Sequence, residues 1–350
     1  MDKYTSIKYV YCQSVSDFSE GLAIIKQKKK CGFINKNGDI IISCIYDDAM
    51  DCTEGLIGVE KDKKWGFISK SGKEVIPFIY EDACVFSEEL AAVLVNDQWG
   101  FINKNGEMVI RPLYDEVDVF SEGLCAVGNE DGWGFIDKNG QLVINHMYDD
   151  AEGFIGGLAC VEMNDMCGCI NKEGHILIPF KYIIDTCYNS DEHIVCAMEE
   201  DETWTFYDKK GNILSSNKNY YWIEEFNDGI AVVESKEKSG CINTEGKMVI
   251  PFEYDQMTWY SEGLIGALKK GMYSFVDKDN KIVIPFEYEG VENFSDGLAK
   301  VHKKSKSYFI NKNNEIVFGI KKSKSFDVGK YWWLFILIGA IGTIIYLLLN

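Results

Sequence analysis

The chain has 350 residues, of which 46% are hydrophobic and 26% are charged, and this balance excludes a chain that is disordered throughout. Its formal net charge is −19, from 36 basic and 55 acidic residues, and Arg111 is its single arginine. A surface this acidic repels phosphate, so we exclude nucleic acid as a partner of the bulk of the chain.

A repeat with a step of about 34 residues dominates the sequence between residues 9 and 318. The segments KWGFISKSGKEVIP, QWGFINKNGEMVIR and GWGFIDKNGQLVIN begin at Lys64, Gln98 and Gly132, and a second marker, Phe-Ser-Glu-Gly-Leu with close variants, keeps the same step. The repeat predicts a domain over residues 1–320 with units near 18–51, 52–85, 86–119, 120–153, 154–187, 188–225, 226–259, 260–293 and 294–320.

Each unit is typical of a three-stranded antiparallel meander. In the third unit, residues 90–95 are β-prone, and residues 99–102 form a second strand whose alternate side chains share one face. Residues 103–106 (NKNG) predict a hairpin turn, after which residues 108–110 begin the third strand.

The turn glycine is missing from the last two units, where Asn280 and Asn314 replace it. Asparagine is the side chain that best tolerates positive φ. The exceptions therefore keep the geometry that the turn requires.

The Trp-Gly pair in the second strand is the most specific motif of the repeat. It is complete at Trp65, Gly66, Trp99, Gly100, Trp133 and Gly134. Tryptophan brings a large apolar surface, and the glycine lets another backbone approach closely. We expect these glycines to lie where strands or repeats meet, and we expect units with Thr205, Ser274 or Tyr308 at this position to pack differently.

These residues resemble the WG-repeat (WG β-repeat) family, whose unit reads WGFINKxG…VIPxxYDxaxxFSEGLAxV. The closing segment also matches at residues 77–80, 251–254 and 285–288, and the resemblance covers nearly all of residues 9–318. It implies a β-rich repeat array without enzymatic activity, and it transfers no catalytic residue.

We predict an all-β fold of nine antiparallel β-meander repeats in an open solenoid or superhelical array, followed by one C-terminal transmembrane helix. Propeller blades usually take about 40–50 residues for four strands. The shorter unit and the irregular sixth copy favour the open array. A propeller-like ring is the alternative.

Acidic residues recur at one phase of the second marker, at Glu20, Glu54, Glu88, Glu122, Glu262 and Asp296. One interpretation is a stripe that binds a basic protein or peptide, and another is that the carboxylates cap loop amides and face solvent. A calcium site would need converging oxygens, and no Asp-x-Asp-x-Asp-Gly loop is present. A second acidic phase follows the tyrosine, at Asp47-Asp48, Glu81-Asp82, Asp115-Glu116 and Asp149-Asp150.

The sequence carries no motif for catalysis, a cofactor or a metal. The four histidines share no repeat phase with a plausible nucleophile, and there is no P-loop, dinucleotide fingerprint, nucleophile elbow or HExxH. The twelve cysteines are scattered, as in a reducing compartment, and Cys31, Cys167, Cys169 and Cys241 replace apolar core positions. We predict a protein that is not an enzyme and has no cofactor.

The charge reverses near the end of the chain. Residues 300–330 contain nine lysines against Glu315 and Asp327, so the first 299 residues carry −26. Residues 321–330 are typical of a basic juxtamembrane linker, with Lys321, Lys322, Lys324 and Lys330. These lysines either fix the topology or also contact anionic lipid headgroups.

Residues 331–349 (YWWLFILIGAIGTIIYLLL) contain no charge. As a helix they would span ~28 Å, close to the hydrocarbon thickness of a bilayer, so we predict a single-pass membrane anchor. The lysine-rich flank places the repeat domain in the cytoplasm, and residues 1–18 lack the apolar region of a signal peptide.

Together these features predict a non-enzymatic, membrane-anchored scaffold for protein–protein interaction at the cytoplasmic face. Its partners would be the lipid bilayer and a protein or peptide, with a basic one favoured by the charge. The alternative is an outward-facing module that binds envelope material or glycan, which requires the opposite topology.

Overall fold

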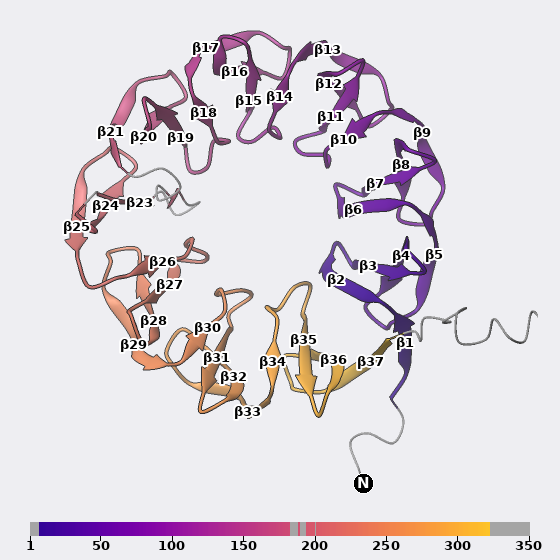
Figure 1. Ribbon diagram of the computed structural model, residues 1–350, viewed down its shortest axis with the longest axis vertical. Helices are drawn as coiled ribbons and strands as arrows, with labels where there is room; N and C mark the ends of the chain where they lie inside the picture. Colours follow the sequence, from indigo (N-terminus) through magenta and orange to yellow (C-terminus); the bar gives the residue numbers. More distant parts are fainter. Residues whose placement is uncertain (1–6, 183–187, 190–193, 200, 323–350) are drawn as a thin grey trace, which may run out of the picture.

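The computed structural model describes residues 7–182, 188–189, 194–199 and 201–322, and over these residues the chain forms a closed ring of nine β-sheets (Figure 1). In each sheet four consecutive strands follow chain order from the centre of the ring to its perimeter. Each sheet is therefore one blade of a propeller, and the blades are numbered 1 to 9 along the chain.

Every blade holds four antiparallel strands that follow one another in the chain, and an N-terminal strand is added as a fifth to blade 9. The innermost strands are β2 (Ser14–Ser19), β6 (Asp48–Thr53), β10 (Asp82–Ala83), β14 (Glu116–Val117), β18 (Asp150–Ala151), β22 (Tyr188–Asn189), β26 (Trp222–Ile223), β30 (Gln256–Met257) and β34 (Gly290–Val291). The second strands are β3 (Leu22–Gln27), β7 (Leu56–Lys61), β11 (Leu90–Val95), β15 (Leu124–Asn129), β19 (Leu158–Met163), β23 (Ile194–Met198), β27 (Ile230–Glu234), β31 (Ile265–Lys269) and β35 (Leu298–Lys303). The third strands, which carry the Trp-Gly phase, are β4 (Lys30–Asn35), β8 (Lys64–Ser69), β12 (Gln98–Asn103), β16 (Gly132–Asp137), β20 (Met166–Asn171), β24 (Trp204–Asp208), β28 (Ser239–Asn243), β32 (Met272–Val276) and β36 (Lys306–Asn311). The outer strands are β5 (Ile40–Tyr46), β9 (Glu74–Tyr80), β13 (Met108–Tyr114), β17 (Leu142–Tyr148), β21 (Ile176–Tyr182), β25 (Ile213–Asn217), β29 (Met248–Tyr254), β33 (Ile282–Tyr288) and β37 (Ile316–Lys322).

The prediction of an open solenoid is wrong, and the closed ring, given above as the alternative, is the observed architecture. A 34-residue unit holds four strands because the innermost strand is only two residues long in most blades. The ring closes because an N-terminal strand, β1 (Tyr9–Cys12), pairs in parallel with β37 in blade 9. The first and last described parts of the chain therefore share one sheet.

The predicted transmembrane segment, residues 331–349, lies outside the described residues, as do Lys324 and Lys330. In the part of the chain that the structure describes, no helix has the length and apolar character needed to cross a bilayer. Lys321 and Lys322, expected in the linker, are the last two residues of β37.

The hydrophobic core lies between neighbouring blades, where the two sequence markers meet. The Phe after Trp-Gly in one blade packs edge-on against the Phe of the second marker in the next blade, as in the pair Phe101 and Phe120, whose ring centroids are 5.0 Å apart. Phe309 of blade 9 and Phe18 of blade 1 repeat this contact at 5.3 Å. The closing junction thus has the same aromatic core as an internal one.

The glycine of the Trp-Gly pair accommodates a bulge in the outer strand of the same blade. Trp99 of β12 pairs with Tyr114 of β13, and Phe101 pairs with Ile110. The outer strand therefore has four residues of advance where β12 has two, which is a bulge. A Cβ on Gly100 would lie 2.7 Å from the carbonyl oxygen of Ile110. The strands therefore meet at the glycine, as the sequence predicts.

The units without this glycine behave in two ways. Beside Thr205 and Tyr308 the pairing runs in regular register, with no bulge opposite either residue. Beside Ser274 the bulge is kept. The expectation of different packing is confirmed for the two larger side chains and is wrong for the small serine.

The predicted hairpin turn is confirmed. Asn103 accepts hydrogen bonds at Oδ1 from the amides of Asn105 and Glu107, both at 3.0 Å. Asn280 and Asn314 have φ of 63° and 62°, so they adopt the left-handed conformation of the glycines that they replace.

Gly100→Val should destabilise the ring by about 3 kcal/mol, because the new side chain must displace the backbone of the β13 bulge. Urea denaturation of the full chain measures the loss. Ser274→Ala is the matched control, since Ser274 Oγ is buried without a hydrogen-bond partner among the described residues and its removal should change little. Equal stability of Gly100→Val and wild type would refute this role for the glycine.

Candidate functional site

The six carboxylates of the predicted acidic stripe lie at the junctions between blades. Each accepts a hydrogen bond from a backbone N–H of the next blade. The pairs are Glu20 with Gly55 (3.1 Å), Glu54 with Glu89 (3.0 Å), Glu88 with Gly123 (2.9 Å), Glu122 with Gly157 (3.0 Å), Glu262 with Gly297 (3.0 Å) and Asp296 with Gly21. The carboxylates therefore cap loop amides, and the amide belongs to the neighbouring repeat.

A lysine from the hairpin turn of that next blade completes the contact. The ion pairs are Lys70 with Glu20 (2.7 Å), Lys104 with Glu54 (3.1 Å), Lys138 with Glu88 (3.0 Å), Lys172 with Glu122 (2.9 Å), Lys312 with Glu262 (3.1 Å) and Lys36 with Asp296 (3.7 Å). The Lys70 hydrogen bond holds the pKa of Glu20 below its usual range.

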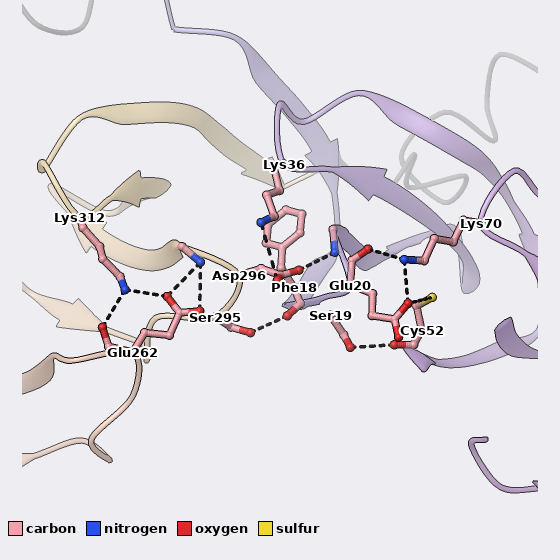
Figure 2. Close-up of polar contacts among 12 residues, drawn as sticks. Phe18, Ser19, Glu20, Lys36, Cys52, Lys70, Glu262, Ser295, Asp296 and Lys312 are labelled. Atoms are coloured by element: carbon pink, nitrogen blue, oxygen red, sulfur yellow. Dashed lines mark hydrogen bonds and ion pairs between the residues drawn. The ribbon is translucent and has the colours of Figure 1, made fainter. Parts of the chain in front are cut away.

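The serine of the second marker adds a third contact. Ser87 Oγ donates to the carbonyl oxygen of Phe120 at 2.7 Å, and Ser261 Oγ donates to that of Phe294 at 2.7 Å. Ser295 makes the same bond to Phe18 across the closing junction (Figure 2). Figure 2 shows that blade 9 meets blade 1 through the serine, acid and lysine contacts used inside the ring.

The backbone explains why an acid stands at this position. Glu88 has φ of 51° and lies in a tight turn between Ser87 and Leu90, where asparagine or glycine would fit with less strain. The glutamate side chain reaches the next blade, which a glycine cannot do. The capping and ion-pair contacts offset the strain of the turn.

Asp296→Ala and Glu88→Ala should each destabilise the full chain by about 1–2 kcal/mol, because each leaves an interblade amide and a lysine without their partner. Equal losses in urea denaturation are expected, since one junction closes the ring and the other is internal. Glu130→Ala, a change at an exposed acid in a hairpin turn, is the control and should stay within about 0.5 kcal/mol of wild type. A loss for Glu88→Ala with none for Asp296→Ala would mean that the ring is open in solution.

The second acidic phase serves the inside of each blade. Its carboxylates accept hydrogen bonds from the amides of the next hairpin turn in the same blade, in the pairs Asp47 with Asp62 (3.0 Å), Glu81 with Asp97 (3.3 Å), Asp149 with Asn164 (2.6 Å), Asp255 with Lys270 (2.9 Å) and Glu289 with Lys304 (3.0 Å). The six acids of the first phase, and Asp47, Glu81 and Asp149 of the second, are therefore engaged in structural contacts.

A third set of acids, missed by the sequence analysis, lies on or directly after the innermost strands. These inner-rim carboxylates are Asp17, Asp51, Asp118, Glu152, Glu224, Glu225 and Glu292. They stand one or two residues before the Phe position of the second marker, and this shared phase was the signal that could have found them.

The inner-rim carboxylates crowd one another. Burial raises the pKa of Asp17, and the neighbouring Glu292 raises it further. Burial also raises the pKa of Glu152 to about 7, with repulsion from nearby acidic groups that include Glu225 adding to the effect. Lys300 pairs with Glu292 and partly offsets the repulsion at Asp17. A further cation would be stabilised here.

A hollow of about 380 Å³ opens in this rim where blades 7, 8, 9 and 1 come together. We call it the inner-rim hollow, and the charged and aromatic residues that line it are Asp17, Glu224, Glu234, Trp259 and Glu292. Trp259 is 64% exposed, and its indole hydrogen bond to Glu224 opposes the rise in pKa that burial causes there. An exposed aromatic face among carboxylates suits a cationic side chain.

The described thiols are poor candidates for chemistry. Burial raises the pKa of Cys31 and Cys52 to about 11 and that of Cys241 to about 12, so these thiols stay protonated near neutral pH. Cys167 and Cys169 are buried in the core between blades 5 and 6. Among the described residues, no group of three His, Cys, Asp or Glu side chains is arranged to hold a metal ion.

The chain belongs to the WG-repeat family. The model of the WG containing repeat matches residues 11–31, 32–65, 65–99, 99–132, 133–167, 168–182, 204–238, 240–273 and 273–306. These matches follow the blades around the ring. No curated protein is similar enough in sequence to count as a relative.

Solved structures are similar to this chain at low sequence identity. A crystal structure of the eukaryotic initiation factor has a TM-score of 0.57 at 10% identity, over 80% of this chain and 88% of that one. Kluyveromyces lactis Hsv2p has a TM-score of 0.40 at 12% identity, over 67% and 91% of the two chains. Saccharomyces cerevisiae Sqt1 has a TM-score of 0.39 at 12% identity, over 66% and 82%. The first of these supports the overall fold, and none bears on function.

Proposed function

We propose that this protein is a non-enzymatic propeller scaffold that binds a positively charged segment of a partner protein at the inner-rim hollow. The observation that carries the proposal is the exposed Trp259 indole beside the carboxylates of Asp17, Glu224 and Glu234. A lysine or arginine side chain over the indole would gain cation–π attraction and neutralise part of the crowded charge.

The ring supports this role by rigidity. Around the inner-rim hollow, blades 8, 9 and 1 are joined through serine, acid and lysine contacts, which hold the rim residues of these blades in place. The six acids of the predicted stripe already have lysine partners, and a basic peptide would have to displace those lysines to bind there. The inner rim offers carboxylates with fewer cations, which favours it over the stripe.

We further propose that residues 331–349 anchor the scaffold in a membrane and that the ring faces the cytoplasm. The support is the charge-free apolar stretch together with its lysine-rich N-terminal flank. The alternative is an outward-facing module that binds envelope material or glycan, for which exposed aromatics such as Trp259 would also serve. Topology separates the two.

Fluorescein-labelled tetralysine should bind the detergent-solubilised full chain, and Trp259→Ala should weaken that binding about tenfold, measured by fluorescence anisotropy. Tyr221→Ala is the matched control, because Tyr221 is equally exposed at 64% but does not line the inner-rim hollow. Binding should also weaken from pH 7.5 to pH 5, since burial raises the pKa values of Asp17 and Glu224, which line the hollow, and makes both lose their charge early. Equal binding by Trp259→Ala, or equal binding of tetraglutamate, would contradict the proposal.

Ile338→Arg with Ile341→Arg should release the protein from membranes into the soluble fraction after carbonate extraction, because each central arginine costs about 2.5–3.5 kcal/mol in a bilayer. Ile338→Leu with Ile341→Leu is the control and should remain in the pellet. Protease added to intact cells should leave the ring intact. Digestion from outside would favour the outward-facing alternative.

A further inference from the structure

The closing junction carries a second hollow with the opposite charge. It has a volume of about 830 Å³ and lies between the link from β1 to β2 and the outer part of blade 9. We call it the seam hollow, and its basic lining residues are Lys300, His302, Lys306, Lys321 and Lys322. The described residues that line it include no carboxylate, although the net charge of the chain is −19.

The local reversal of charge has a specific origin in the repeat. Gln13 stands at the phase that holds Asp47, Glu81 and Asp149 in other blades, and it accepts the same turn hydrogen bond, from the amide of Lys29 at 3.1 Å. Ser14 stands at the phase of Asp48. Both residues line the seam hollow, so neutral donors replace the two acids that would repel an anion.

The cations of this hollow differ in how they are engaged. Lys300 is paired with Glu292 on the inner-rim side. The ammonium group of Lys321 lies 4.0 Å from the Tyr9 ring centroid and 5.7 Å from that of Tyr11. Within the described part of the chain, no carboxylate forms an ion pair with Lys306, Lys321 or Lys322, and the turn carboxylate of Glu289 bonds backbone amides instead. Three lysine charges therefore remain for a ligand.

Hydroxyl donors complete the lining. Ser305 and Ser307 belong to it, and Ser307 Oγ lies 2.9 Å from His302 Nδ1. A phosphate group could bind here, because the lysines supply positive charge and the hydroxyl and amide groups can donate hydrogen bonds to its oxygens.

We propose that the seam hollow binds the phosphate of an anionic lipid headgroup. We assign the phosphate to a lipid because of where the chain leaves the ring. Strand β37 ends at Lys322, and residues 323–330 can span at most ~28 Å before the apolar stretch begins. This choice of source rests on the proposed anchor, since residues 331–349 would hold the hollow close to a bilayer surface. A bound headgroup would contact β36, β37 and the link after β1 together, and would thereby stabilise the closing blade.

The test uses the full chain in neutral detergent micelles, so its outcome does not depend on whether residues 331–349 span a bilayer. Phosphatidylglycerol added to the micelles should raise the melting temperature by about 4 °C. The variant Lys306→Gln, Lys321→Gln, Lys322→Gln should lose most of that shift. Its melting temperature without lipid should lie within about 2 °C of wild type, because the three side chains are exposed and have no ion-pair partner among the described residues, and only the cation–π contact of Lys321 with the Tyr9 and Tyr11 rings is lost.

Lys209→Gln with Lys210→Gln, which neutralises exposed lysines of blade 6, is the control and should keep the full shift. Two further arms use phosphatidylcholine and inorganic phosphate at the same concentration. An equal shift with inorganic phosphate would assign the site to free phosphate and overturn the lipid proposal. An equal shift with phosphatidylcholine, or an undiminished shift in the triple variant, would overturn the site itself. Failure of membrane anchoring would appear separately, in the carbonate extraction described above.

Discussion

The structure depends on one contact that is repeated around the ring, the junction in which a carboxylate of one blade binds an amide and a lysine of the next. At Glu88 it joins Gly123 and Lys138, and at Asp296 it joins Gly21 and Lys36. Because the junction reaches forward by one unit, a last unit without a following one would leave these groups unsatisfied. Closure onto blade 1 satisfies them, and strand β1 completes the same sheet.

This junction also explains how charge is distributed over the molecule. Most acids of the two phases that the sequence singled out hold blades and turns together, so the net charge overstates what is available for a ligand. Asp17 and Glu224 on the inner rim have no lysine partner in an ion pair among the described residues, and both line the hollow beside Trp259. At the closing junction, Gln13 and Ser14 stand at positions where other blades carry acids. The lysines at the end of β37 make the local charge positive. The two hollows therefore suit ligands of opposite sign.

Closure of the ring was the feature that local sequence patterns predicted incorrectly. The length of the unit argued against four strands, but the two-residue strand β10 shows how a fourth strand fits. Such a strand leaves no periodic signal of its own, since two residues cannot display alternation. The inner-rim acids were missed for a related reason: their phase falls on that short strand and the loop after it, and only the ring shows that this loop faces the centre.

The sequence by itself determined the number of units, the hairpin turns with Asn280 and Asn314, the strand that carries Trp99 and Gly100, and membership of the WG-repeat family. These features are local, because a turn or an alternating strand is encoded within a few adjacent residues. Only the tertiary structure decided that the array closes, which carboxylates are engaged and which remain for a ligand. Those properties depend on contacts between residues 35, 50 or 275 positions apart, such as Asp296 with Gly21, and no local pattern encodes the direction in which successive blades turn.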